Sequence, residues 1–183
     1  MARIELWNGD ICDLEVDAIV NPANLSLWMA TGVGGAIKRA GGDSIEFAAV
    51  RQAPVPLGGS IVTPAGKLAA RAVIHAVSLD RDRRTSAPVI ASAVRSAMAR
   101  AREIGAKSVS FPALGTGVGG FPLDEAARIT VDGRNGRRSG RDPRTVGRPS
   151  RVTTTSTPRR PARGRWRRRS AGVPPDGSEA AVD

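Results

Sequence analysis

The chain has 183 residues, the size of one domain with room for a sizeable core. Its formal net charge of +11 is concentrated near the C-terminus, because residues 1–132 carry 14 Lys and Arg against 13 acids whereas residues 133–183 carry 14 Arg against 4 acids. The single cysteine, Cys12, excludes an internal disulfide and a cysteine-based metal cluster, and no run approaches the ~18 apolar residues of a membrane span.

Short apolar runs alternate with helical patterns along the first part of the chain. Strands are expected at residues 4–7, 16–20, 60–64, 72–77 and 107–112. Helices are expected at residues 33–39 and 44–52, from a first turn at Pro88 to a stop at Gly105, and from Leu123 to Val131. This alternation predicts an α/β domain with helices on both faces of one sheet.

The sequence changes character after Asp132. Residues 133–183 contain no Leu, Ile, Met or Phe, and are filled mainly by Arg, Gly, Pro, Ser and Thr. Such a segment cannot bury enough apolar surface to offset the entropy of ordering, so we expect a domain at 1–132 and a disordered tail at 133–183. The boundary interrupts a helical pattern, which leads to the hypothesis of a shifted reading frame in a GC-rich gene; sequencing the coding DNA tests it.

A first polar cluster follows the first two strands. Gly9-Asp10-Ile11 places one carboxylate in a turn, and Asn21-Pro22-Ala23-Asn24 carries two carboxamides into a loop. This loop leads to Gly32-Val33-Gly34-Gly35, a glycine-rich turn that opens a helix. Backbone N–H groups at such a turn, together with the positive end of the helix dipole, form a site for phosphate.

A second glycine-rich turn follows the strand at 107–112. It consists of Gly115, Thr116, Gly117, Val118, Gly119 and Gly120, with Phe121 and Pro122 before the next helix. Two anion sites, one carboxylate and two amides fit a nucleoside diphosphate linked to a further sugar. The turn also matches the dinucleotide fingerprint G-x-G-x-x-G, but the only acid near the required spacing is Asp142 in the tail, so a dehydrogenase is a poor second choice.

Each polar residue also has a simpler interpretation. Asp10 suits the amino group of adenine beside the Ile11 amide, or it is a turn aspartate that bonds its own backbone. Asn21 and Asn24 suit ribose hydroxyls, and Asn24 suits the orientation of a water, or both are turn residues. His75, the only histidine, lies in an apolar strand, which favours a core imidazole with one hydrogen bond over a catalytic base.

Taken together, the motifs make residues 3–132 resemble the macro domain family in motif type, order and spacing. The matching stretches are 9–11, 16–24, 32–37, 73–77 and 111–122. The resemblance implies a three-layer α/β/α sandwich with a mixed sheet and a site for ADP-ribose, with Asp10 and Ile11 at adenine and Asn24 at the distal ribose. The expected ligand-binding residues are Asp10, Ile11, Asn21, Asn24, Gly32, Val33, Gly34, Gly35, Gly115, Thr116, Gly117, Val118, Gly119 and Phe121.

The chain departs from the family pattern in three places. Gly34 stands where some hydrolytic members have an aspartate, and Lys38 stands where they have a histidine. Gly119 stands where many members have an aromatic residue. Members also continue with a further strand inside the sheet and a closing helix, which we do not expect residues 133–183 to supply. An empty position in the sheet would leave backbone donors unpaired.

We therefore expect a protein that binds ADP-ribose, an ADP-ribosylated protein, O-acetyl-ADP-ribose or ADP-ribose 1″-phosphate, without a metal or cofactor. Whether it also hydrolyses the distal ribose ester, or acts as an ADP-ribose-1″-phosphate phosphatase, stays open; Asn24 is the candidate catalytic residue. The alternatives are a nucleic-acid-binding protein that uses its basic tail without sequence specificity, and a truncated, nonfunctional product. The N-terminus has no apolar h-region, so we expect a cytosolic protein with no membrane partner. We also expect a monomer.

Overall fold

The computed structural model describes residues 3–134 and 151–155. Within them, strands form one mixed sheet in the order β1-β6-β5-β2-β4-β3. The strands are β1 Arg3–Trp7, β2 Ala18–Asn24, β3 Ser60–Pro64, β4 Ala72–Leu79, β5 Ser108–Pro112 and β6 Arg151–Thr155. Every neighbouring pair is parallel except β3 and β4, which are antiparallel. The mixed sheet expected from the family resemblance is thus confirmed.

Helices connect the strands as the alternating pattern predicts. They are the 3-10 turn η1 Ile11–Asp13 and the α-helices α1 Gly32–Gly41, α2 Ser44–Val50, α3 Ala87–Glu103 and α4 Leu123–Arg134. Pro88 lies in the first turn of α3, and Gly105 follows its end with a positive φ of 67°. That conformation is easy for glycine and difficult for other residues, which explains why the helix stops there.

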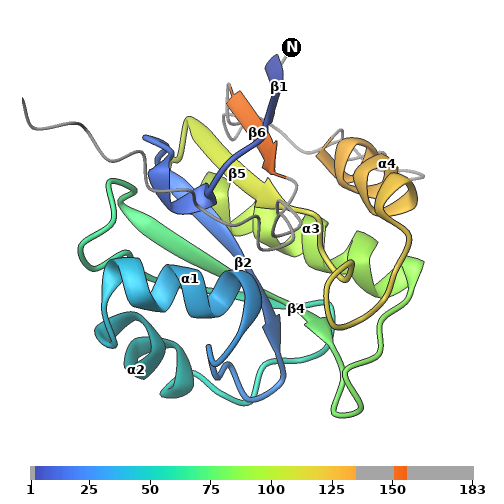
Figure 1. The fold of residues 1–183 in the computed structure, drawn as a ribbon, viewed down its shortest axis with the longest axis horizontal. Helices are drawn as coiled ribbons and strands as arrows, with labels where there is room; N and C mark the ends of the chain where they lie inside the picture. Colours follow the sequence, from blue (N-terminus) through green and yellow to red (C-terminus); the bar gives the residue numbers. More distant parts are fainter. Residues whose placement is uncertain (1–2, 135–150, 156–183) are drawn as a thin grey trace, which may run out of the picture.

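The sheet lies between two helical layers (Figure 1). Successive residues of a strand point to opposite faces, so adjacent residues of β2 enter different cores. Ile19 packs in a cluster with Ile37 of α1, whereas Val20 packs in a cluster with Ile90 of α3. All four side chains are fully buried. The predicted α/β/α sandwich therefore follows from buried strands that are apolar on both faces.

The strand β6 corrects one expectation. Its backbone pairs with β1 on one side and β5 on the other, in the sheet position that we expected to be empty. The sequence of residues 151–155 is Arg-Val-Thr-Thr-Thr, and its β-branched residues suit a strand although the segment has no Leu, Ile or Phe. The expected loss of a closing helix concerns residues outside the described ranges, and so does most of the expected disordered tail.

Candidate functional site

A cavity of about 670 Å³ lies at the carboxyl edge of the sheet. Asn24 at the end of β2, Leu79 at the end of β4 and Ala113 just after β5 line it. Because these three strands are parallel neighbours, their carboxyl ends meet at one edge and the loops that follow them form the walls. The two glycine-rich turns, which are far apart in the sequence, therefore face the same cavity.

Most of the residues expected to bind a ligand line this cavity. They are Asn21, Asn24, Gly32, Val33, Gly34, Gly115, Thr116, Gly117, Val118, Gly119 and Phe121. Gly35 instead lines a second cavity of about 360 Å³. Asp10 and Ile11 line neither cavity, and Ile11 is buried in the core beside Val16. The assignment of Asp10 and Ile11 to adenine stays a prediction.

The first glycine-rich turn is the N-terminus of α1. Gly32 has a positive φ of 61°, which turns the chain into the helix. Thr31 precedes the helix without capping it through its side chain, and the first turn of α1 contains no acidic residue. The leading N–H groups and the positive end of the helix dipole are therefore available to an anion in the cavity.

The second glycine-rich turn is folded back on itself by backbone hydrogen bonds. Gly120 N–H donates to the Gly117 carbonyl at 3.2 Å, and Phe121 N–H donates to the Gly115 carbonyl at 3.0 Å. A Cβ atom on Gly119 would lie 2.7 Å from the Gly115 oxygen, so a side chain there would force the turn apart. This packing explains the glycine at position 119, where an aromatic residue is frequent in the family that the chain resembles.

Asn24 belongs to a strand rather than a loop, which corrects the predicted end of that strand at Val20. The strand β2 continues through Pro22 because β5 pairs with β2 only at Ala18 and Ile19, so that edge of β2 is unpaired further on. The Asn24 side chain then makes a local turn: its Oδ1 accepts from the Ser26 N–H at 3.0 Å and from the Ser26 hydroxyl at 2.8 Å. The simpler interpretation as a turn residue therefore holds beside its place in the cavity wall.

Asn21 is held by a buried hydrogen-bond chain across the sheet. Its Nδ2 lies 3.1 Å from Nδ1 of His75, and Nε2 of His75 lies 2.9 Å from Oγ1 of Thr63. Burial lowers the pKa of His75 to about 4, so the ring is neutral, accepts from Asn21 and donates to Thr63. This leaves Oδ1 of Asn21 buried and without a partner in the described part of the chain, 3.0 Å from where a Cβ on Gly34 would lie.

Asp10 forms the short turn that the simpler interpretation anticipates. Its Oδ1 accepts from the Cys12 N–H at 2.9 Å and caps η1. Burial, reinforced by the hydrogen bond and the charge of Asp10, raises the pKa of the Cys12 thiol to about 12. Cys12 packs against the core cluster of Ile11 and is an inert thiol, not a nucleophile.

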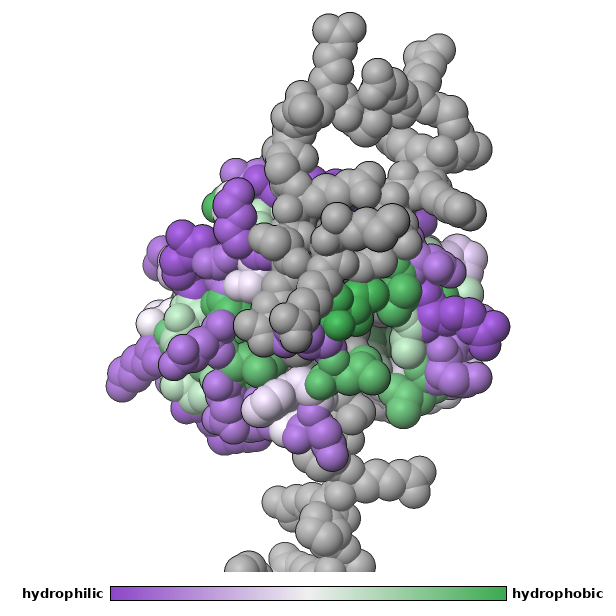
Figure 2. Space-filling model, turned by 90° about the horizontal axis from the view of Figure 1, so that it is seen from above, coloured by the Kyte–Doolittle hydropathy of each residue, from purple (hydrophilic) through white to green (hydrophobic). Residues whose placement is uncertain are grey.

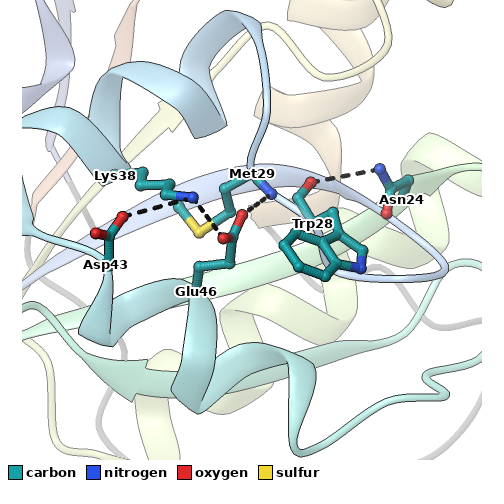
Figure 3. Close-up of polar contacts among 6 residues, drawn as sticks. All are labelled: Asn24, Trp28, Met29, Lys38, Asp43 and Glu46. Carbon is teal, nitrogen blue, oxygen red and sulfur yellow. Dashed lines mark hydrogen bonds and ion pairs between the residues drawn. The ribbon is translucent and has the colours of Figure 1, made fainter.

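A buried carboxylate anchors the loop that runs from β2 to α1 (Figure 3). Glu46 of α2 is 1 % exposed; its Oε2 accepts from the Met29 N–H at 2.7 Å, and its Oε1 pairs with Nζ of Lys38 at 2.5 Å. The hydrogen bond to Glu46, followed by the charges of Glu46 and Asp43, raises the pKa of Lys38. Lys38, which stands at the position of a histidine in some hydrolytic members of the family that the chain resembles, is thus committed to a structural ion pair.

Among the residues of the cavity wall that were not anticipated, Trp28 and Arg83 have the largest polar or aromatic side chains. Trp28 lines the cavity although its side chain is 57 % exposed, and Arg83 also lines it. The only signal for Trp28 is a tryptophan in a loop between polar Asn24 and the glycine-rich turn. Arg83 has a positive φ of 60° in a turn closed by Asp80, and its sequence context carries no comparable signal.

The cavity wall is poor in groups that transfer protons. Among the described residues that line it, Arg83 is the only ionisable one, and none is Asp, Glu or His. No group of three His, Cys, Asp or Glu residues in the described ranges is placed to hold a metal ion. The site is therefore suited to binding through amides and a helix N-terminus.

The surface around the described domain is mixed in character. On the face seen in Figure 2, hydrophobic residues gather toward the middle and hydrophilic residues surround them. Within the described residues, no helix combines the length and the apolar character that a membrane crossing requires.

Known proteins of one family are similar to this chain over most of its length. A family model described as Macro domain matches residues 20–130. An uncharacterized protein of Mycobacterium tuberculosis strain H37Rv is 44% identical over 131 residues, which are 72% of this chain and 36% of that protein. The chain thus spans about a third of the length of its mycobacterial relatives. A protein of Salmonella gallinarum named O-acetyl-ADP-ribose deacetylase is 40% identical over 136 residues, 71% of this chain and 76% of that protein.

Known structures share the fold. A mutant macrodomain of Oceanobacillus iheyensis with ADPR has a TM-score of 0.71 and 30% identity, over 86% of this chain and 86% of that one. A Trypanosoma brucei macrodomain in complex with ADP-ribose has a TM-score of 0.70 and 27% identity, over 84% of this chain and 63% of that one.

Proposed function

Because the chain belongs to the macro domain family, we propose that its 670 Å³ cavity binds ADP-ribose, as free ligand or as part of a larger molecule. The observation that carries the proposal is the meeting of two glycine-rich turns at one cavity, each with backbone N–H groups suited to a diphosphate. Relatives with 27–30% identity and the same fold are described in complex with ADPR or ADP-ribose.

The proposed binding mode assigns parts of the ligand to named groups. The first turn of α1, at Gly32 to Gly34, takes one side of the diphosphate, and the turn at Thr116 to Gly119 takes the other. Asn24 contacts the distal ribose, and the carboxylate of Asp10 takes the amino group of adenine. Asn21 also lines the cavity and is one further candidate contact for a ribose hydroxyl.

Calorimetry of the full chain with ADP-ribose tests the proposal, with adenosine and ribose 5-phosphate as comparison ligands. We expect saturable binding of ADP-ribose that is tighter than either fragment. No heat at millimolar ADP-ribose, from protein whose circular dichroism shows it folded, would overturn the proposal.

Two variants of one residue that differ in charge give a more specific test. Val33 lines the cavity in the first turn of α1. Val33→Glu places a carboxylate where the diphosphate is proposed. Val33→Gln introduces a side chain of nearly the same shape as Glu but without the charge. We expect Val33→Glu to bind ADP-ribose at least about tenfold more weakly than Val33→Gln, which is roughly 1.4 kcal/mol of repulsion. Equal affinities of the two variants for ADP-ribose would mean that the diphosphate does not lie at the N-terminus of α1.

Ester hydrolysis at the distal ribose is the second candidate function, favoured by the relative named O-acetyl-ADP-ribose deacetylase. The chain would supply positioning of a water by Asn24 and loop amides that stabilise developing negative charge. The described cavity wall has no Asp, Glu or His. We therefore expect a slow reaction whose rate does not follow the ionisation of a protein side chain between about pH 5.5 and 8.5. Chromatography of O-acetyl-ADP-ribose digests over this pH range tests it, and a bell-shaped profile would contradict the mechanism.

A further inference from the structure

The loop between β2 and α1 presents one tryptophan to the solvent. Leu27 is fully buried and Met29 is 2 % exposed, yet Trp28 between them is 57 % exposed. A tryptophan buries about 150–250 Å² when it is packed, so leaving most of the indole in water forgoes a large hydrophobic gain. Its neighbours anchor the loop in the core while Trp28 points outward.

The loop is fastened on both sides of Trp28 (Figure 3). The Trp28 carbonyl accepts from Nδ2 of Asn24 at 3.5 Å, and the Met29 N–H donates to the buried carboxylate of Glu46 at 2.7 Å. Leu27 has a positive φ of 61°, a conformation that is strained for a bulky residue and persists only when its surroundings enforce it. The backbone that carries the exposed indole is therefore fixed, so contact with a ligand costs little backbone entropy.

The position of the indole decides what it meets. Trp28 lines the cavity together with Asn24, the residue proposed to contact the distal ribose. A ligand seated between the two glycine-rich turns would thus present its distal ribose beside Asn24 and Trp28. A group attached to that ribose has to leave the cavity past its rim, where Trp28 and the exposed Arg83 stand.

We propose that Trp28 recognises the polypeptide attached to the distal ribose of an ADP-ribosylated protein, and so selects protein-linked over free ADP-ribose. The inference rests on the proposed binding of ADP-ribose and names the substrate class. A rigid aromatic surface of this size fits the apolar stems and backbone of a peptide, and Arg83 adds a cation for an acidic side chain. An acetyl or phosphate group is too small to use most of an exposed indole.

Two ligands and three variants of the full chain test the inference. The ligands are free ADP-ribose and a short acidic peptide that carries one ADP-ribose through a non-hydrolysable linkage. Trp28→Ala should weaken the peptide at least about tenfold more than it weakens free ADP-ribose, while Trp28→Phe should recover most of this difference. Phe47→Ala is the matched control, because Phe47 is 60 % exposed on α2 and does not line the cavity.

The outcomes separate this inference from the function on which it rests. A wild-type chain that binds neither ligand would refute both. Binding of ADP-ribose with equal affinity for the peptide, or an unchanged peptide Kd in Trp28→Ala, would refute only the role of Trp28. Equal weakening of both ligands by Trp28→Ala would show that the indole contacts ADP-ribose itself, which also overturns the inference.

Discussion

At the scale of single residues, burial determines which polar groups can do chemistry. His75 is the only histidine of the chain, and its ring is fully buried between Asn21 and Thr63. A proton on this ring would be a buried charge without a counter-ion in either hydrogen bond. The imidazole therefore acts by staying neutral: it orients Asn21 toward the cavity and takes no part as a base.

The state of His75 predicts a pH dependence of stability. The folded ring takes up its proton only near pH 4, whereas an unfolded histidine does so near 6.5. Between these values the unfolded state binds more protons, so the free energy of unfolding falls as the pH falls. From pH 7 to 4.5 we expect His75 alone to remove roughly 2–3 kcal/mol in urea unfolding. His75→Gln should show a shallower slope; parallel slopes would contradict a neutral His75.

The carboxylate of Asp10 predicts a loss of affinity. Its Oδ1 caps η1, and the proposed adenine contact uses its other oxygen. Asp10→Ala should weaken ADP-ribose by roughly 1–3 kcal/mol, as expected for a charge-assisted hydrogen bond. Calorimetry checks the value, and Asp10→Asn, which can still cap η1, separates the turn from the contact. Affinity unchanged in both variants would remove Asp10 from the adenine site.

At the scale of elements, the site depends on how α1 and α2 hold the loop before them. The ion pair of Lys38 and Glu46 links the two helices, and Glu46 fixes the loop through the Met29 N–H. The glycine pattern and the polar residues were predictable because turns and phosphate sites require particular local conformations. The contacts of Glu46 with Lys38 and Met29 were not predictable, since nothing in the local sequence distinguishes Glu46 from a solvated helix residue. Only the packing of α2 buries it.

Removal of the Glu46 carboxylate should lower the stability of the fold and loosen the loop between β2 and α1. Glu46→Ala leaves a buried N–H without its acceptor and Lys38 without its closest partner, so we expect about 2–4 kcal/mol less stability in urea unfolding. Glu46→Gln keeps an acceptor for Met29 and should lose less. Hydrogen exchange at residues 27–31 should accelerate in Glu46→Ala. Unchanged exchange there would mean that the core contacts of Leu27 and Met29 hold the loop without Glu46.

At the scale of the whole molecule, the α/β/α architecture was predictable from alternating apolar runs, but the sheet order was not. Local patterns report which face of a strand is buried and carry no information on its neighbours. The strand β6 was missed because the C-terminal segment was judged by its lack of large apolar residues, whereas a strand between two others is also stabilised by backbone pairing and β-branched residues. The pairing of β1 with β6, which are far apart in the sequence, could therefore not be predicted from local patterns.

Truncation tests how much the fold depends on β6. Among the described strands, β1 pairs only with β6, and β6 also covers the edge of β5. A chain ending at residue 134 loses both five-residue ladders, so β1 should detach and stability should fall by roughly 5–10 kcal/mol, at about 0.5–1 kcal/mol per lost backbone hydrogen bond. A chain ending at residue 157 keeps β6 and should match the full chain. Urea unfolding and hydrogen exchange at residues 3–7 distinguish the two, and equal stability of both truncations would show that β6 contributes nothing to the sheet.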